Sequence, residues 1–163
     1  MSDASLPVQT FNHVAISVPA SLLDAEGRAS LLDFYGSVFG WTEMPTLTRD
    51  GELLVLRAHS NEQFVFLAAS PTPARCGDMD HFGLSVRSKA EFDGLLARAR
   101  AAAAAGDDVE IFGPESEDHY GVLSLHSFYV RYALPMRVEV QCFEWKPGLG
   151  PQSLPGSEGK AAS

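Results

Sequence analysis

Two stretches of seven residues share one pattern of polar and apolar positions. Residues 12–18 read NHVAISV and residues 80–86 read DHFGLSV, so that His13 and His81 stand at matching points. In each copy, apolar residues alternate with small or polar ones, as they do in a half-buried β-strand. The repeat predicts two modules that fold alike, each opening with a strand that carries a histidine.

The periodicity of the rest of the chain predicts the same β-α-β-β-β order in both halves. Gly40 and Gly106 are expected to end the two helices, and Ser88 with Glu91 forms a capping box before the second. The first half is predicted to contain strands over residues 11–18, 41–47, 53–58 and 63–68, a helix over 27–38 and a turn over 49–51. The second half is predicted to contain strands over residues 81–86, 109–112, 123–131 and 136–143, a helix over 89–105 and a long loop over 113–121.

These elements predict an α+β protein. Two βαβββ modules, about 9–70 and 78–145, would pair their sheets into one curved, open, mixed β-sheet barrel with flanking helices. The inner faces of the first strands would then meet at a shared cleft. We expect residues 9–145 to form a single domain between an N-terminal tail, 1–8, and a disordered C-terminal tail, 146–163, which is rich in Pro, Gly and Ser.

Composition narrows the class of protein. The 163 residues carry a net charge of −9, which argues against nucleic acids and anionic membrane surfaces as partners. No apolar run approaches the length of a membrane-spanning helix, and the N-terminus lacks the features of a signal peptide. Two cysteines, Cys76 and Cys142, form neither a disulfide framework nor a CxxC metal pattern. We expect a soluble, cytoplasmic protein.

The candidate chemistry begins with the two histidines. His13 shares its strand face with Ala15 and Ser17, and His81 shares its face with Gly83 and Ser85. Small neighbours leave room for a ligand above the sheet, whereas the opposite faces carry the bulky apolar residues. Both imidazoles are therefore predicted to face a cavity, although a lone strand histidine is more often a structural residue than a metal ligand.

The last strand adds a carboxylate. Glu139 alternates with Val138 and Val140, and a glutamate within an apolar strand is costly to bury unless it is paired or binds a cation. It could form a salt bridge with Arg131 or Arg137. Together with His13 and His81 it would complete a 2-His-1-carboxylate site, which suits Fe(II) and also Mn, Zn, Co or Ni.

Six short motifs make the sequence resemble the vicinal oxygen chelate superfamily over residues 10–145. This superfamily includes glyoxalase I, extradiol dioxygenases, bleomycin- and fosfomycin-resistance proteins and methylmalonyl-CoA epimerase. The resemblance implies a divalent metal bound by His13, His81 and Glu139, a small-molecule substrate and a homodimer. The motifs are NHVAI at 12–16, LDFY at 32–35, FGW at 39–41, DHFGLSV at 80–86, FYVR at 128–131 and RVE at 137–139.

Departures from the family pattern refine the expectation. Phe66 is predicted to stand where glyoxalase I-like members carry a fourth ligand, so a three-ligand site is expected. Tyr129, ten residues before Glu139, matches a tyrosine of the extradiol enzymes. Those enzymes also use an upstream histidine as acid or base. His119 and His126 are the nearby candidates here, although neither falls at the family's spacing.

Three functions remain open on the sequence. The first is a metalloenzyme with extradiol-dioxygenase-like or lyase/isomerase chemistry, in which Tyr129 or His119 carries a proton. The second is a metal-free drug-binding protein of the bleomycin-resistance type, which commonly lacks the ligand triad. The third is a structural or regulatory protein that kept only the fold.

Overall fold

The computed structural model describes residues 10–106 and 108–156 and divides the chain into two compact units, 1–74 and 75–163. The predicted tail 1–8 and residues 157–163 of the predicted tail 146–163 lie outside the described residues. No helix in the described part of the chain combines the length and apolar character needed to cross a bilayer.

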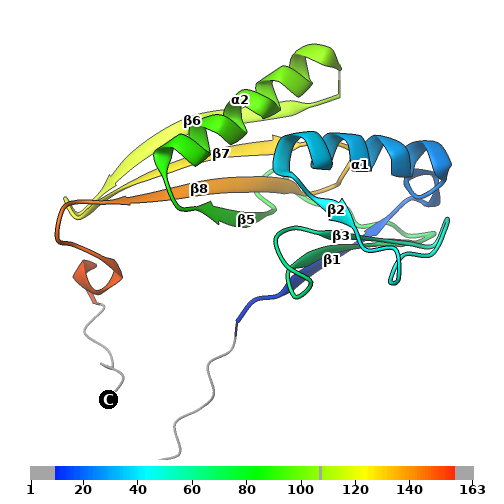
Figure 1. Ribbon diagram of the computed structural model, residues 1–163, viewed down its shortest axis with the longest axis horizontal. Coiled ribbons are helices and arrows are strands. Elements are labelled where there is room, and N and C mark those ends of the chain that lie inside the picture. The colour runs from blue at the N-terminus through cyan, green and yellow to red at the C-terminus, as the bar shows by residue number, and fades with distance from the viewer. Residues whose placement is uncertain (1–9, 107, 157–163) are drawn as a thin grey trace, which may run out of the picture. The chain divides into compact units, whose positions relative to one another are not determined.

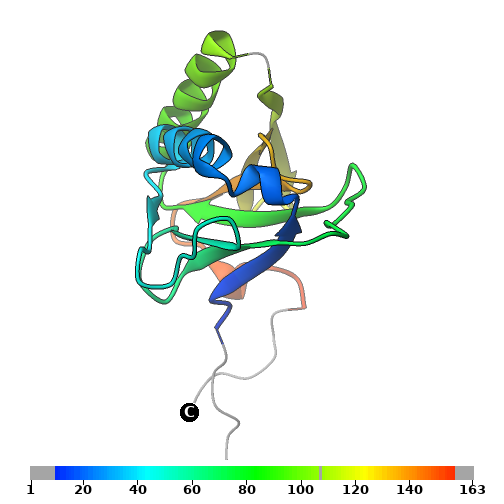
Figure 2. The same ribbon diagram turned by 90° about the vertical axis from the view of Figure 1, so that its right-hand side faces the viewer.

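The first unit is a four-stranded mixed sheet with one α-helix (Figure 1). Its strand order is β1-β4-β3-β2, with β1 parallel to β4 and the other pairs antiparallel. Figure 2 shows β1, in blue, at the edge of this sheet. The elements are β1 (His13–Val18), the 3₁₀-helix η1 (Ala20–Leu22), α1 (Ala25–Phe39), β2 (Thr42–Glu43), β3 (Leu53–Arg57) and β4 (Phe64–Ala69).

The second unit repeats this topology. Its strand order is β5-β8-β7-β6, again with the first and last strands of the module parallel. Helix α2 packs along one face of the sheet, as Figure 1 shows. The elements are β5 (His81–Val86), α2 (Lys89–Ala105), β6 (Glu110–His119), β7 (Leu123–Arg131), β8 (Arg137–Trp145) and the 3₁₀-helix η2 (Pro151–Ser153). The α+β class and the two βαβββ modules are thus confirmed.

Helix α1 begins two residues before its predicted start because Asp24 caps it. The Asp24 carboxylate accepts hydrogen bonds from the backbone N–H groups of Glu26 and Gly27, which satisfies two orphan donors of the first turn. Gly27 also lets the helix approach η1, since a Cβ there would lie 2.5 Å from the Ser21 carbonyl oxygen. Gly40 ends the helix in the left-handed conformation, as predicted.

The predicted strand over 41–47 is wrong beyond its first residues, because β2 contains only Thr42 and Glu43. The Met44 N–H still donates to the Val55 carbonyl, but Pro45 has no N–H with which to continue the ladder. The chain then turns, with the Leu47 N–H donating back to Met44.

The predicted loop over 113–121 is also wrong. The strand that was expected to end at Phe112 continues as β6 to His119 and pairs with β7 throughout, apart from a bulge between Phe112 and Glu115. Gly113 in this bulge has a φ of 87°, which favours glycine. Only Tyr120 and Gly121 remain in a tight turn between the two strands. An edge strand exposed to water can be built from charged residues. The polar residues of this segment therefore do not distinguish a strand from a loop.

Each unit has its own apolar core. In the second unit, Phe92 of α2 meets Phe128 of β7 edge to face, with ring centroids 5.0 Å apart. In the first unit, Tyr35 of α1 stacks on Trp41 at 4.9 Å. These residues are almost fully buried. Residues 151–153 of the predicted C-terminal tail form the 3₁₀-helix η2.

Candidate metal centre

The register of the second sheet brings three predicted site residues together. Gly83 of β5 lies opposite Glu139 of β8, and Glu139 lies opposite Tyr129 of β7. His81 stands two residues before Gly83 and therefore on the same face. The side chains of His81, Glu139 and Tyr129 thus gather on one face of three neighbouring strands.

Glu139 is buried, with 5% of its surface exposed, and its carboxylate faces the His81 ring. The Nε2 atom of His81 and the Oε2 atom of Glu139 are 3.4 Å apart. The Nδ1–H of His81 donates to the Met79 carbonyl at 2.8 Å. Because a carbonyl only accepts, the Nδ1 proton is committed, and in the neutral ring the Nε2 lone pair points toward the carboxylate.

This arrangement fits a cation. A lone pair and a carboxylate oxygen repel each other at 3.4 Å unless positive charge lies between them. Two ligand atoms about 2.1 Å from one tetrahedral ion lie roughly 3.4 Å apart, so the observed separation is compatible with two ligands of a single metal as well as with an ion pair. The Nδ1 hydrogen bond is also the usual second contact of a metal-ligating histidine.

Gly83 keeps space beside the carboxylate. A Cβ placed on Gly83 would lie 3.3 Å from Oε2 of Glu139, closer than an ordinary van der Waals contact. A larger residue would require the carboxylate to shift by a few tenths of an ångström. The small residue that the sequence pattern singled out therefore has a defined steric role.

Tyr129 contacts both potential ligands. Interaction of its hydroxyl with the Glu139 carboxylate, then partial burial and the negative charge of Glu139, raises the pKa of Tyr129. The Tyr129 ring also meets the His81 ring edge to face at 5.3 Å. Tyr129 therefore keeps its proton at neutral pH and holds it at the carboxylate.

His13 is presented in the same way in the first unit. Its Nδ1–H donates to the Asn12 side-chain oxygen at 2.9 Å, and its ring lies flat on Phe64 with centroids 5.0 Å apart. Its Nε2 is thereby left as the potential ligand atom, as in His81. Within neither unit do three His, Cys, Asp or Glu side chains of described residues group to hold a metal; His81 and Glu139 form a pair.

The structure does not bring His119 to this pair. His119 lies opposite Leu123 at the far end of β6, six positions along β7 from Tyr129, or about 20 Å. Its Nε2 instead lies 3.5 Å from Glu117. His119 lies apart from the His81–Glu139 pair within this unit because it belongs to a long extended strand and not to a loop that could fold back.

His126 lies on the other face of the sheet. Its ring contacts Phe92 of α2, and its two nitrogens lie 2.7 Å from the Ser116 hydroxyl and 3.0 Å from the Glu144 carboxylate. Both nitrogens are satisfied in a half-buried network. His126 therefore faces away from Glu139 and is hydrogen-bonded at both ring nitrogens.

Arg137 lies beside the His81–Glu139 pair, although the sequence suggested it only as a possible salt-bridge partner of Glu139. Neither Arg137 nor Arg131 forms that ion pair. Arg131 binds Glu110 at 2.6 Å, and Arg137 lies 3.8 Å from Asp78. Arg137 stands opposite His81 in the parallel β5–β8 pair. That register, if read from the aligned motifs, could have indicated its place beside the site.

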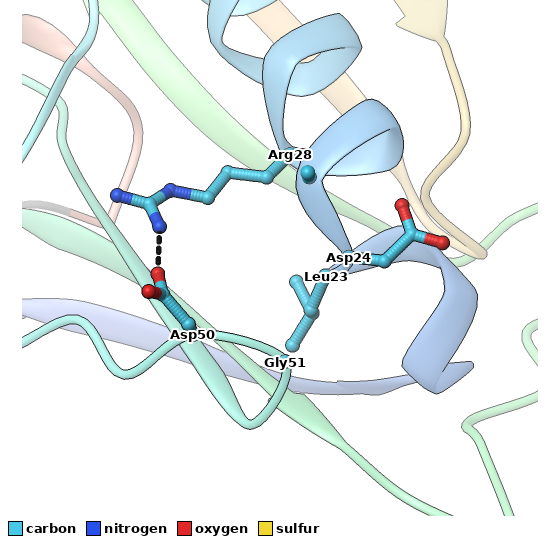
Figure 3. Close-up of a pocket in the computed structure, with 6 residues that line it drawn as sticks. Leu23, Asp24, Arg28, Asp50 and Gly51 are labelled. Atoms are coloured by element: carbon cyan, nitrogen blue, oxygen red, sulfur yellow. Dashed lines mark hydrogen bonds and ion pairs between the residues drawn. The ribbon is translucent and has the colours of Figure 1, made fainter.

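The first unit also has a cavity of about 350 Å³ at the start of α1, shown in Figure 3. Arg28 lies at its wall and is committed to two carboxylates, Glu43 at 2.5 Å and Asp50. Hydrogen bonding to Glu43 raises the pKa of Arg28 and fixes its charge. The cavity is lined by Leu23, Asp24, Ala25, Arg28, Asp50 and Gly51, none of which was predicted to bind a ligand.

No family model matches the sequence, and no curated protein matches it either. Solved structures do match its fold. A possible glyoxalase from Bacillus cereus is 18% identical with a TM-score of 0.57, covering 83% of this chain and 100% of that one. A glyoxalase/bleomycin resistance protein/dioxygenase from Alicyclobacillus acidocaldarius is 18% identical with a TM-score of 0.58, covering 80% and 89%.

A lactoylglutathione lyase from Agrobacterium tumefaciens is 19% identical with a TM-score of 0.52, covering 83% of this chain and 95% of that one. These proteins belong to the vicinal oxygen chelate superfamily. At such identities the likeness is one of fold, and it agrees with the duplicated βαβββ topology. The chain therefore has the vicinal oxygen chelate fold.

Proposed function

We propose that this protein is a metal-dependent enzyme that binds a divalent ion through His13, His81 and Glu139 and acts on a small, oxygen-chelating substrate. The ion would be Fe(II), Zn, Mn, Ni or Co, and the reaction would be an extradiol-type dioxygenation or a lyase or isomerase step. We further propose that the protein is a cytoplasmic homodimer. The three ligands would come either from one chain or from both.

The pairing of His81 with Glu139 carries this proposal. A buried carboxylate faces an imidazole nitrogen at 3.4 Å, and the other ring nitrogen is committed to Met79. A protonated His81 would also satisfy the pair electrostatically. The matching presentation of His13, with its own Nδ1–H committed to Asn12, supports the metal over the proton.

The residues of the site have separable roles in such an enzyme. A bound divalent ion would act as a Lewis acid that polarises a substrate oxygen. His13, His81 and Glu139 would hold it. Tyr129 would keep a proton near the Glu139 carboxylate and exchange it with the substrate, while Gly83 leaves room for that carboxylate above the sheet.

A metal-free binding protein is the second candidate, and one feature of the first unit favours it. His13 stacks on Phe64, and Phe66 follows on the same face of β4, so that this face presents aromatic rings instead of a second carboxylate. Aromatic walls suit the sequestration of planar drugs. A drug-binding protein would show ligand-induced thermal shifts without turnover.

Metal analysis separates the two candidates. Protein purified without chelator should carry about one divalent ion per site by inductively coupled plasma mass spectrometry. His13→Ala, His81→Ala and Glu139→Gln should each lose most of it, because each removes one of three ligands. His59→Ala is the matched control, since His59 is exposed and lies in a loop. Wild-type protein that cannot be loaded, or ligand variants that retain metal like the control, would contradict the enzyme.

A further inference from the structure

Arg137 carries a positive charge that no carboxylate neutralises at hydrogen-bonding distance. Only 15% of its side chain is exposed, and its Nε is buried without an acceptor among the described residues. A buried donor without a partner is costly, so the Arg137 guanidinium keeps donor capacity that the described side chains do not use.

Asp78 shows what kind of group the site attracts. Its Oδ1 lies 3.7 Å from Nη1 of Arg131 and 3.8 Å from Nη2 of Arg137, between two guanidinium groups. Both distances exceed a hydrogen bond, and the Asp78 side chain is 84% exposed. Asp78 is thus a weakly held carboxylate that a ligand oxyanion can displace.

The two arginines differ in how much binding capacity they retain. Arg131 donates from Nε and Nη2 to Glu110, which largely neutralises it. The guanidinium carbon of Arg137 lies over the Phe112 ring, 3.8 Å from the ring centroid. Stacking fixes the plane of the guanidinium without using its N–H donors. Arg137 therefore keeps its donors available for an anion, whereas Arg131 contributes mainly its remaining Nη1 donor.

The position of Arg137 connects it to the candidate metal pair. It lies directly opposite His81, on an adjacent strand about 4.8 Å away, and two residues before Glu139 on the same face. One small molecule can therefore reach both the His81–Glu139 pair and the Arg137 guanidinium.

We infer that Arg137, supported by Arg131, is the subsite for an oxyanion on the substrate, a carboxylate or a phosphate-type group. We also infer that the same molecule binds the metal through its oxygens. Only this second claim rests on the proposed function. Binding of the anion itself requires no metal. Arginine recognises both groups through paired N–H donors, so the test must distinguish them.

Isothermal titration with small aromatic probes tests the subsite. Benzoate, phenylphosphonate and neutral benzamide are titrated into wild-type protein at fixed ionic strength, once after chelator treatment and once after loading with Mn(II). We expect the anions to bind and benzamide not to bind. The tighter of the two anions identifies the carboxylate or the phosphate-type source.

Variants assign the binding to Arg137. Arg137→Gln should weaken anion affinity about tenfold or more, because it removes a charge-assisted contact. Asp78→Asn should strengthen it several-fold, because it removes the competing carboxylate. Arg87→Gln is the matched control, since Arg87 is an exposed arginine paired with Glu91. Circular dichroism verifies folding, and Asp78→Asn still tests the site if Arg137→Gln fails to fold.

The outcomes are distinguishable from a failure of the proposed function. Arginine-dependent anion binding in protein that takes up no metal supports the subsite and contradicts the metalloenzyme. Metal uptake in protein whose anion binding is absent, or equal in Arg137→Gln and Arg87→Gln, overturns the subsite and leaves the metal centre standing. Anion affinity that Asp78→Asn leaves unchanged or weakens also overturns it.

Discussion

Phe66 occupies in the first unit the register position that Glu139 occupies in the second. Phe66 lies opposite Ala15, two residues after His13, and Glu139 lies opposite Gly83, two residues after His81. The two sheets share one topology, but they carry different side chains at this position. One unit supplies an imidazole beside aromatic rings, and the other supplies an imidazole paired with a carboxylate.

Gly83→Ala should weaken metal binding without unfolding the protein. The new Cβ would lie 3.3 Å from Oε2 of Glu139 and force the carboxylate to shift. Displacing a ligand in this way should reduce metal affinity about tenfold, as loss of a supporting contact does. Metal titration by calorimetry measures the change. Gly94→Ala is the control, because a helical Cβ there meets only the far end of Arg98 at 4.0 Å and should stabilise α2 slightly.

Tyr129 should titrate above its ordinary value of 10, because its hydroxyl interacts with Glu139. The difference in absorbance at 295 nm between wild type and Tyr129→Phe isolates this tyrosine among four. Glu139→Gln should lower the pKa of Tyr129 toward 10, since it removes the negative charge. A titration identical in wild type and Glu139→Gln would contradict the contact.

The same shift predicts a pH dependence of stability. The folded state holds the Tyr129 proton more tightly than the unfolded state, so its contribution is complete below pH 10. It is lost as the pH rises through the higher pKa of the folded state. Urea unfolding above pH 10 should therefore show a steeper loss of stability in wild type than in Tyr129→Phe.

Cys142 should resist alkylation while Cys76 reacts. Burial, and then the charge of Glu144, raises the pKa of the Cys142 thiol, which disfavours the nucleophilic thiolate. Cys76 is partly exposed, and both cysteines are free. Iodoacetamide labelling followed by peptide mass spectrometry should modify Cys76 first, and Cys142 only after denaturation. Equal labelling of the native protein would be inconsistent with this packing.

Phe128→Ala should cost about 3–5 kcal/mol of the free energy of unfolding, because the ring is fully buried against Phe92. Urea denaturation followed by circular dichroism measures it. Phe11→Ala is the size-matched control: that ring is 81% exposed and its loss should change stability by no more than about 0.5 kcal/mol. Similar losses in both variants would show that the core of the second unit is wrongly assigned.

Local chemistry was enough to predict much of the fold. The bounds of β5 and β7 and the end of α1 at Gly40 follow from alternation and capping, which act between near neighbours in the chain. The prediction failed at β2, where Pro45 removes a ladder donor, and at β6, where a polar segment pairs as an edge strand. A strand of that kind is stabilised by its partner and not by its own sequence.

Strand parity was enough to predict the duplication, the face on which each histidine lies and the lack of a carboxylate at Phe66. Which side chains meet across strands depends on the folded sheets. The sheet register puts Tyr129 opposite Glu139 and Arg137 opposite His81. It also puts His119 about 20 Å from Tyr129. Cross-strand neighbours are set by register and bulges, which the order of residues along one strand does not contain.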